Sequence, residues 1–341
     1  MNKKILFLSA DTGDYLNISL LHGFKSLINI EVVDYPKSYV SYKEYKNELI
    51  HKVRGNGFTL FFNLNEDNVN RFHLKFQELP HDEFDLIIFG DIQSTYGYYL
   101  EYYDFLNPNS VVFLDGSDAP HLFGNSGFFW RKLFLHLAPK PQHRFLYFKR
   151  ELVEEELNYS RFYKLLPKSV VKHFPLNKNL RKISFSIPEE KIIKSPPQKI
   201  KMFTSHIVDE EIVKNMEGGK STYLFTSEEE YYKDIQDSKY GITTKRAGWD
   251  CLRHYEIAAN GAVLCFKDLD KKPKYCAPHD LVIGHNCISY SSYDDLMNQI
   301  NSISEEKYCF LQEESLKWVK TKTTVNMAKY ILKEQDKYLN K

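Results

Sequence analysis

Residues 241–266 hold the side chains of this sequence that most strongly suggest chemistry. They read GITTKRAGWDCLRHYEIAANGAVLCF. In a helix over residues 250–259, Glu256 falls on the stripe that should face the protein, so a carboxylate occupies a face that is normally apolar. The other members of that stripe are Leu252, Tyr255 and Ala259.

Positive charge precedes this carboxylate. Lys245 and Arg246 lie in the loop before the helix and Arg253 in its first turn, where free backbone N–H groups already favour an anion. In one interpretation, Glu256 and Arg253 form an ordinary helix-surface ion pair. In the other, Glu256 accepts hydrogen bonds from a ribose while the basic groups hold a diphosphate. The position favours the second, because nucleotides bind where strands end and helices begin in a parallel sheet.

The pattern around this motif predicts a strand, a polar loop, a short helix and a buried strand. We expect strands over residues 240–244 and 262–266, with the helix between them. Asp250 is the predicted N-cap, and Gly261 lies where a left-handed residue should end the helix.

Acidic residues follow two predicted strands in the first half of the chain. A strand over residues 5–8 leads into the loop that contains Asp14, and one over 111–114 leads into the loop that contains Asp118. Loops that follow parallel strands share one rim of the sheet. These residues are either turn formers or catalytic carboxylates, since loops often carry function. A further strand is expected over residues 58–64.

Composition limits the class of protein. A chain of 341 residues predicts two domains. The formal net charge of +1 disfavours a nucleic-acid partner. The five cysteines form no C-x-x-C pair, so we expect neither a zinc site nor a disulfide framework. We do expect a cytoplasmic location. The first residues predict a strand, not a signal peptide.

Prolines at positions 196 and 197 indicate a linker. The predicted domains are residues 1–195 and 196–341, each an α/β unit, with a long helical tract over about 305–339. Residues 123–137 are aromatic, basic and amphipathic. They fit a helix packed on its own domain or a peripheral contact with a membrane or a lipid-linked acceptor.

This layout resembles the GT-B glycosyltransferases, in which two Rossmann-like domains face each other across a cleft. The residues 253–263, RHYEIAANGAV, are similar to the R-x-[FY]-E-x-x-x-x-G-x-x signature of their nucleotide-sugar-binding half. The nearest resemblance is to family 1/CgeB-like enzymes of bacterial capsule and O-antigen synthesis, and it covers residues 203–303 best.

The resemblance implies roles for the residues that match. Glu256 would bind the donor ribose, and Lys245, Arg246 or Arg253 would neutralise the diphosphate. Ser205 and His206 would lie near the same pyrophosphate.

The sequence departs from the retaining members of this fold. Many carry a second glutamate seven or eight positions before the ribose-binding one, where this chain has Trp249 and Gly248. Inverting and retaining mechanisms therefore both stay open. An inverting enzyme would need a base from the N-terminal half, and the candidates are Asp118, Asp14 and His121, in that order.

The sequence thus predicts a metal-independent enzyme that moves a sugar from a nucleotide sugar to a glycan or lipid-linked acceptor in surface polysaccharide synthesis. It needs no cofactor besides that donor. The alternatives are a sugar-nucleotide epimerase, a non-catalytic nucleotide- or glycan-binding protein of the same fold, and a nucleic-acid base glucosyltransferase, which the charge balance disfavours.

Overall fold

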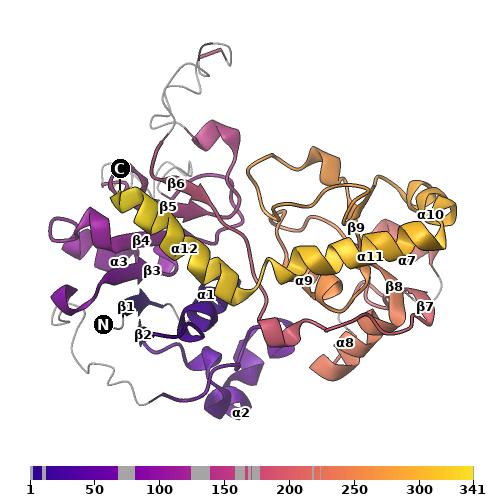
Figure 1. The fold of residues 1–341 in the computed structure, drawn as a ribbon, viewed down its shortest axis with the longest axis horizontal. Coiled ribbons are helices and arrows are strands. Elements are labelled where there is room, and N and C mark those ends of the chain that lie inside the picture. Colours follow the sequence, from indigo (N-terminus) through magenta and orange to yellow (C-terminus); the bar gives the residue numbers. More distant parts are fainter. Residues whose placement is uncertain are drawn as a thin grey trace.

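The computed structural model describes residues 3–9, 13–67, 81–123, 139–157, 166–167, 170, 177–216, 219–222 and 224–340. Its strands form two parallel sheets, one from the first half of the chain and one from the second (Figure 1). The predicted fold class, α/β with two Rossmann-like units and a long helical C-terminal tract, is confirmed. The two sheets lie on either side of residues 195 and 196, and the exact domain boundary stays a prediction.

The first sheet has the strand order β2-β1-β3-β4-β5-β6, with every adjacent pair parallel. Short runs of apolar residues such as ILFL and LIIF form its central strands, as expected for strands covered on both faces. Asp115 pairs in register with Lys149, so the loops after β4 and β5 begin side by side. The strands are β1 (Lys3–Leu8), β2 (Ile30–Tyr35), β3 (Leu86–Phe89), β4 (Val111–Asp115), β5 (Leu146–Lys149) and β6 (Leu180–Lys182).

Helices cover this sheet on both faces. The main ones are α1 (Tyr15–Lys25) and α3 (Ile92–Tyr102), and α2 (Lys46–Leu49) and α5 (Pro141–Arg144) are single turns. The described part of this half also has short 3₁₀-helices, at Tyr39–Ser41, Lys43–Tyr45, Ile50–Lys52, Gly55–Gly57, His81–Glu83, Pro108–Ser110, Glu154–Glu156 and Glu189–Lys191.

The second sheet has the order β10-β9-β8-β7 and is also parallel. Its strands are β7 (Lys201–Phe203), β8 (Ser238–Thr243), β9 (Val263–Lys267) and β10 (Ile288–Tyr290). The helices are α7 (Glu210–Asn215), α8 (Glu228–Asp237), α9 (Leu252–Ala259) and α10 (Tyr293–Ser302), with a 3₁₀-helix at Leu269–Lys271.

The closing tract is two helices, not one. Helix α11 (Glu305–Lys320) lies on the second unit, and α12 (Thr324–Leu339) crosses back to the first, where it packs on α1 (Figure 1). The break comes at Thr323, whose hydroxyl accepts the Asn326 N–H over 3.1 Å as an N-cap. Contact between α1 and α12 is close, because a Cβ on Gly23 would lie 2.1 Å from the Thr324 carbonyl oxygen.

Residues 59–62 form turns and Leu64 makes only an isolated bridge with Tyr42, so the strand predicted over 58–64 is wrong. Thr59 and Phe62 have φ values of 67° and 55°, which no strand contains. The aromatic side chains are nevertheless buried, because they pack on Ile18 of α1 and on Leu252 of the second unit. An apolar run buried in this way has the same residue pattern as a strand.

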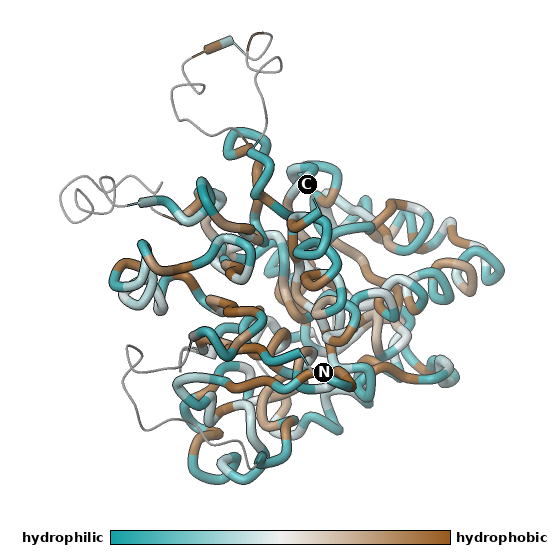
Figure 2. The backbone as a smooth tube through the Cα atoms, turned by 60° about the vertical axis from the view of Figure 1, so that its left-hand side comes forward, coloured by the Kyte–Doolittle hydropathy of each residue, from teal (hydrophilic) through white to brown (hydrophobic). Residues whose placement is uncertain are grey.

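Hydrophobic and hydrophilic residues alternate along the helical segments in Figure 2, as expected of helices with one buried face. Among the residues that the structure describes, no helix has the length and apolar character that crossing a membrane requires. Nearly all of the segment 123–137 lies outside the described residues.

Candidate functional site

The predicted nucleotide-binding motif forms the expected strand, loop, helix and strand. Gly261 ends α9 with a φ of 72°, which confirms the predicted left-handed C-cap. The predicted N-cap is wrong. Cys251 occupies the cap position and makes no side-chain cap bond, whereas the buried Asp250 carboxylate accepts the Phe185 N–H and the Tyr255 hydroxyl, each over 2.8 Å. Burial raises the pKa of Asp250 to about 6.

Glu256 faces the protein as predicted, with 7% of its surface exposed. Its Oε2 accepts the Tyr231 hydroxyl over 2.7 Å, and its Oε1 accepts the hydroxyl of Thr59, which comes from the first unit. Burial raises the pKa of Glu256, while these two hydrogen bonds and the charge of Arg253 oppose that shift. Helix α9 thus carries a buried carboxylate with a hydroxyl donor on each of its two oxygens.

Arg253 acts electrostatically on two predicted donor-site residues. Its charge favours the ionised form of Glu256, and it disfavours protonation of His206. Burial first, and Arg253 second, lower the pKa of His206 to about 4. The neutral imidazole therefore donates from Nδ1 to the Thr222 carbonyl oxygen, 3.1 Å away. The fold thus brings Arg253 within electrostatic reach of both Glu256 and His206.

Ser205 has a different set of partners. Its hydroxyl and main-chain N–H both donate to the Asp234 carboxylate of α8, over 2.6 and 2.9 Å, and its hydroxyl accepts from Lys201 over 2.9 Å. These contacts fasten the end of β7 to α8. They give Ser205 a structural role beside the predicted one.

Lys245 and Arg246 are exposed in the loop that follows β8. The Lys245 ammonium lies 5.1 Å from the centre of the Trp249 ring, in a cation–π contact. The Arg246 N–H donates to the Gly248 carbonyl oxygen over 3.2 Å, which curls the loop. Both side chains lie at the surface, where an anionic ligand could reach them.

The acidic residues of the first unit meet at one rim, as predicted for loops after parallel strands. The Asp14 carboxylate caps α1 by accepting the Asn17 N–H over 2.8 Å. It also closes on the loop after β4, because a Cβ on Gly116 would lie 2.9 Å from its Oδ2. Burial raises the pKa of Asp14 to about 6.

Asp118 has a half-exposed side chain that forms an ion pair with Arg150. The third base candidate, His121, has its Nδ1 3.2 Å from the buried Glu156 carboxylate and is also half-exposed. Both residues lie in the loop after β4. Asp118 is the one that contacts the second unit.

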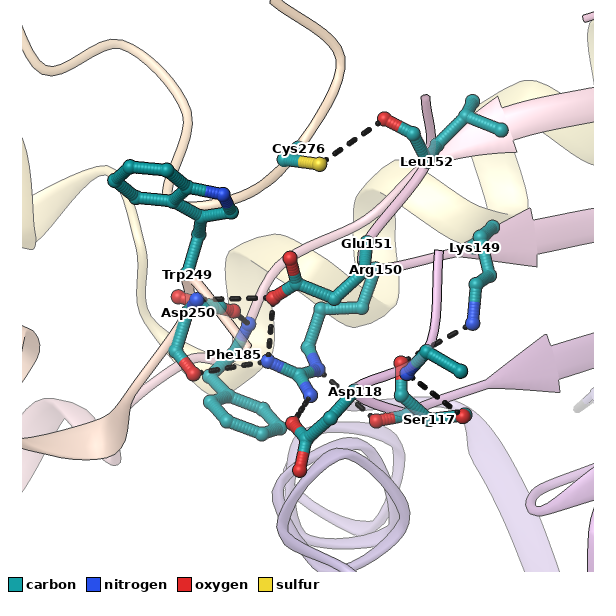
Figure 3. Close-up of polar contacts among 12 residues, drawn as sticks. Ser117, Asp118, Lys149, Arg150, Glu151, Leu152, Phe185, Trp249, Asp250 and Cys276 are labelled. Atoms are coloured by element: carbon teal, nitrogen blue, oxygen red, sulfur yellow. Dashed lines mark hydrogen bonds and ion pairs between the residues drawn. The ribbon is translucent and has the colours of Figure 1, made fainter. Parts of the chain in front are cut away.

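Arg150 is the centre of this contact (Figure 3), and only 1% of its surface is exposed. Besides Asp118, its guanidinium donates to the Gly116 carbonyl oxygen over 3.0 Å and to Glu151 over 3.0 Å. It reaches the second unit through the Asp250 carbonyl oxygen, 2.9 Å away. Glu151 in turn accepts the Asp250 N–H over 2.9 Å. Two charged neighbours at the end of β5 therefore hold the loop before α9.

Gly248 shows how closely the two units approach here. A Cβ at this position would lie 2.6 Å from the Glu151 Oε1 and 2.9 Å from the Asp118 Oδ1. The loop that carries Lys245 and Arg246 is therefore in contact with the acidic rim that carries Asp118. A carboxylate that could take a proton and cations that could stabilise a leaving diphosphate occupy adjacent loops.

Sequence reasoning gave no role to Arg150. The signal was its position directly after a buried strand, in Lys149-Arg150-Glu151, at the same rim as the acidic loops. Thr59 and Tyr231 carried no signal, because their relation to Glu256 exists only in the folded chain. Across the described ranges, no group of three or more histidine, cysteine, aspartate or glutamate side chains is arranged to hold a metal ion.

Comparisons with known proteins give structural similarity at low sequence identity. No protein-family model and no curated protein matches the chain. Among solved structures it is similar to Alr3699/HepE of Anabaena in complex with UDP and glucose, at 11% identity and a TM-score of 0.48, over 98% of this chain and 100% of that one. We therefore infer the chemistry of this chain from its own residues and not from these similarities.

Two further structures are similar to a comparable degree. One is a glycosyltransferase from Rickettsia africae, at 10% identity and a TM-score of 0.48, over 99% of this chain and 98% of that one. The other is MnaA of S. aureus with UDP, at 8% identity and a TM-score of 0.43, over 100% and 97% of the two chains.

Proposed function

We propose that this chain is a glycosyltransferase that moves a sugar from a nucleotide sugar to a hydroxyl of a glycan or lipid-linked acceptor, without a metal ion, in surface polysaccharide synthesis. The observation that carries the proposal is the contact between the acidic loop after β4 and the basic loop before α9, at Asp118 and Gly248. The proposal includes a cytoplasmic location and a peripheral membrane contact through residues 123–137.

The donor half of the reaction belongs to the second unit. Arg253, together with the exposed Lys245 and Arg246, would hold the diphosphate near the start of α9 and stabilise its charge as it leaves. His206 lies within the field of Arg253 and adds a neutral imidazole. Glu256 would bind the ribose through its carboxylate.

The acceptor half belongs to the first unit. Deprotonation of the attacking hydroxyl needs a base with access to the reacting centre. Asp118 is the first candidate, since it is half-exposed and touches the basic loop. Asp14 is the second, because a pKa of about 6 suits a group that accepts a proton near neutral pH. His121 is the third.

The test combines binding with turnover. Purified protein is heated with UDP-, GDP-, CMP- and dTDP-sugars, and donor hydrolysis is followed in parallel. A ligand at 100 times its Kd should stabilise the fold by ~2.7 kcal/mol, a shift of several degrees. One nucleotide family should stabilise the native protein and should lose this effect in Glu256→Gln, which keeps the shape of the side chain. Glu306→Gln, on an exposed turn of α11, serves as the matched control. A native protein that no nucleotide stabilises would contradict the proposal.

A non-catalytic nucleotide- or glycan-binding protein is the second candidate. It is favoured by the contacts of the two carboxylates proposed as the base, since Asp118 is paired with Arg150 and Asp14 caps α1. In that case Asp118→Asn and Asp14→Asn would leave ligand binding and biological activity unchanged. A glycosyltransferase would keep donor binding in these variants and lose transfer.

A further inference from the structure

Residues 54–63, which we term the latch, reach from the first unit onto the second. The side chain of Asn56 donates to the Phe225 carbonyl oxygen over 2.8 Å. The ring of Phe58 stacks on that of Tyr231, with 6.0 Å between their centres. Tyr231 also donates to Glu256, so the latch lies against the residues that surround the predicted ribose-binding carboxylate.

Thr59 makes the central contact of the latch. Its N–H donates to the Glu228 carboxylate over 2.5 Å, its hydroxyl lies 2.7 Å from that of Tyr232, and the same hydroxyl donates to Glu256. Its φ of 67° is unusual for a β-branched residue. The polar contacts with the second unit therefore hold the backbone in a conformation that it would otherwise avoid.

The latch places a hydroxyl donor on Oε1 of Glu256, so that both carboxylate oxygens already accept a hydrogen bond. Oε1 accepts from Thr59 and Oε2 from Tyr231, and only 7% of the residue is exposed. A ribose hydroxyl would make the same O–H···O contact with Oε1 that the Thr59 hydroxyl makes. Because so little of Glu256 is exposed, a ribose hydroxyl has to enter where the Thr59 hydroxyl now lies, so the two donors compete for the same space beside Oε1.

We propose that the latch is an autoinhibitory contact, in which the Thr59 hydroxyl occupies the place of a ribose hydroxyl on Glu256 until the nucleotide displaces it. The inference rests on the proposed function, because it takes Glu256 as the ribose-binding residue. It adds that the donor site is closed from within the chain when no donor is bound.

The surroundings of the latch allow it to move. Gly55 and Gly57, with φ values of 60° and 70°, flank Asn56 and supply backbone freedom. A cavity of about 610 Å³ beside the latch is lined by Asn56 and Phe58 on one side and by Ser227 and Glu228 on the other. Beyond Thr59, the side chains of residues 60–62 are buried in a hydrophobic cluster. The first part of the latch can thus swing only if the buried Phe58 ring leaves its cluster with Tyr231 and Ile257, while the second part stays in place.

The first experiment compares Thr59→Val with the native protein. Valine keeps the shape and removes the hydroxyl that competes for Glu256. Thr226→Val makes the same change on the wall of the same cavity. Titration calorimetry with UDP, GDP and dTDP should show at least about fivefold tighter binding to Thr59→Val, because less of the protein is held in the closed state. Thr226→Val should bind as the native protein does.

The outcomes separate the two proposals. If a nucleotide binds the native protein and Glu256→Gln weakens it, but Thr59→Val binds equally or more weakly, the donor site stands and the latch inference is wrong. If no nucleotide binds any of these proteins, both are wrong.

A second measurement distinguishes two responses of the latch to nucleotide: displacement from Glu256, and closure over the bound nucleotide. Hydrogen exchange is followed in peptides that cover residues 54–63 and α9, with and without saturating nucleotide. Displacement predicts exchange at the Thr59 amide that is faster by about tenfold or more when nucleotide is bound, because its hydrogen bond to Glu228 is lost. Slower exchange there would overturn the inference.

Discussion

The guanidinium of Arg150 donates a hydrogen bond to the main-chain carbonyl oxygen of Asp250 over 2.9 Å, which joins the end of β5 to the loop before α9. Burial opposes the charge on Arg150, but nearby carboxylates more than compensate, and its pKa is raised above the usual value. Its partners include the buried Glu151 as well as Asp118. The contact between the two units therefore depends on a buried cation whose partners come from both.

Arg150→Met should destabilise the protein strongly. The methionine fills much of the space but leaves the Glu151 carboxylate buried without its cation, and breaking a buried ion pair in this way costs about 3–5 kcal/mol. Urea unfolding measures the change. Lys317→Met, which removes an exposed ion-pairing lysine of α11, should have little effect. A change of less than about 1 kcal/mol in Arg150→Met would show that the network is not structural.

Asp14→Asn should change how stability depends on pH. The folded-state pKa of Asp14, about 6, lies above its ordinary value of 3.8. The stabilisation from this group is therefore full below about pH 4 and is lost as the pH rises through about 6. Asparagine stays neutral and still caps α1, so the variant should gain up to about 3 kcal/mol over the native protein at neutral pH and nothing at about pH 4. Unfolding midpoints at the two pH values test this, and equal differences at both would contradict it.

Gly248→Ala should weaken the contact between the units and lower sugar transfer. The added Cβ would lie 2.6 Å from the Glu151 Oε1, so the loop or the carboxylate must shift. Overpacking of this kind costs about 1–3 kcal/mol. Gly97→Ala is the control, because this exposed glycine of α3 has open space around it. It should stabilise the protein by about 0.5–1 kcal/mol. Thermal unfolding measures both variants. If their melting temperatures moved in the same direction, the prediction would be wrong.

Tyr255→Phe removes the hydroxyl that donates to the buried Asp250 carboxylate over 2.8 Å. The ring should keep its stacking on Trp318, whose centre is 5.2 Å away. The loss should therefore be close to that of one hydrogen bond to a charged group, about 1.5–3 kcal/mol. Tyr330→Phe, which removes a bond to the Lys182 carbonyl oxygen at the surface, should cost less. Equal unfolding free energies for the two variants would contradict this assignment.

The sequence predicts the sheets well because each central strand is a short apolar run that ends at a turn residue. Strand predictions fail where apolar side chains are buried for a reason other than lying in a sheet. Residues 58–64 read as a strand, yet residues 59–62 are turns whose side chains are buried between the two units. The break at Thr323 was also missed, because an N-cap threonine inside a helical pattern is a weak signal.

The candidate site was predictable only as far as local pattern reaches. Glu256 was expected to face inward from its helical spacing, and Asp14 and Asp118 to share a rim from the strands before them. Thr59, the partner of Glu256, lies 197 positions away from it in the sequence, and Arg150 lies 100 positions from Asp250. No single-sequence periodicity encodes contacts at such separations, since they are set by how the two units meet.

Helix α12 is synthesised long after α1, yet its Met327, Ala328 and Ile331 belong to the same hydrophobic core as Leu20 and Phe24 of α1. At translation rates of ~5–20 residues per second, the roughly 300 residues between α1 and α12 take about 15–60 s to make, and the face of α1 waits that long for its cover. During this interval it is an apolar surface for chaperones to hold. A stop codon or frameshift before α12 would therefore leave the core around α1 uncovered, and should be as damaging as a lesion within α1 itself.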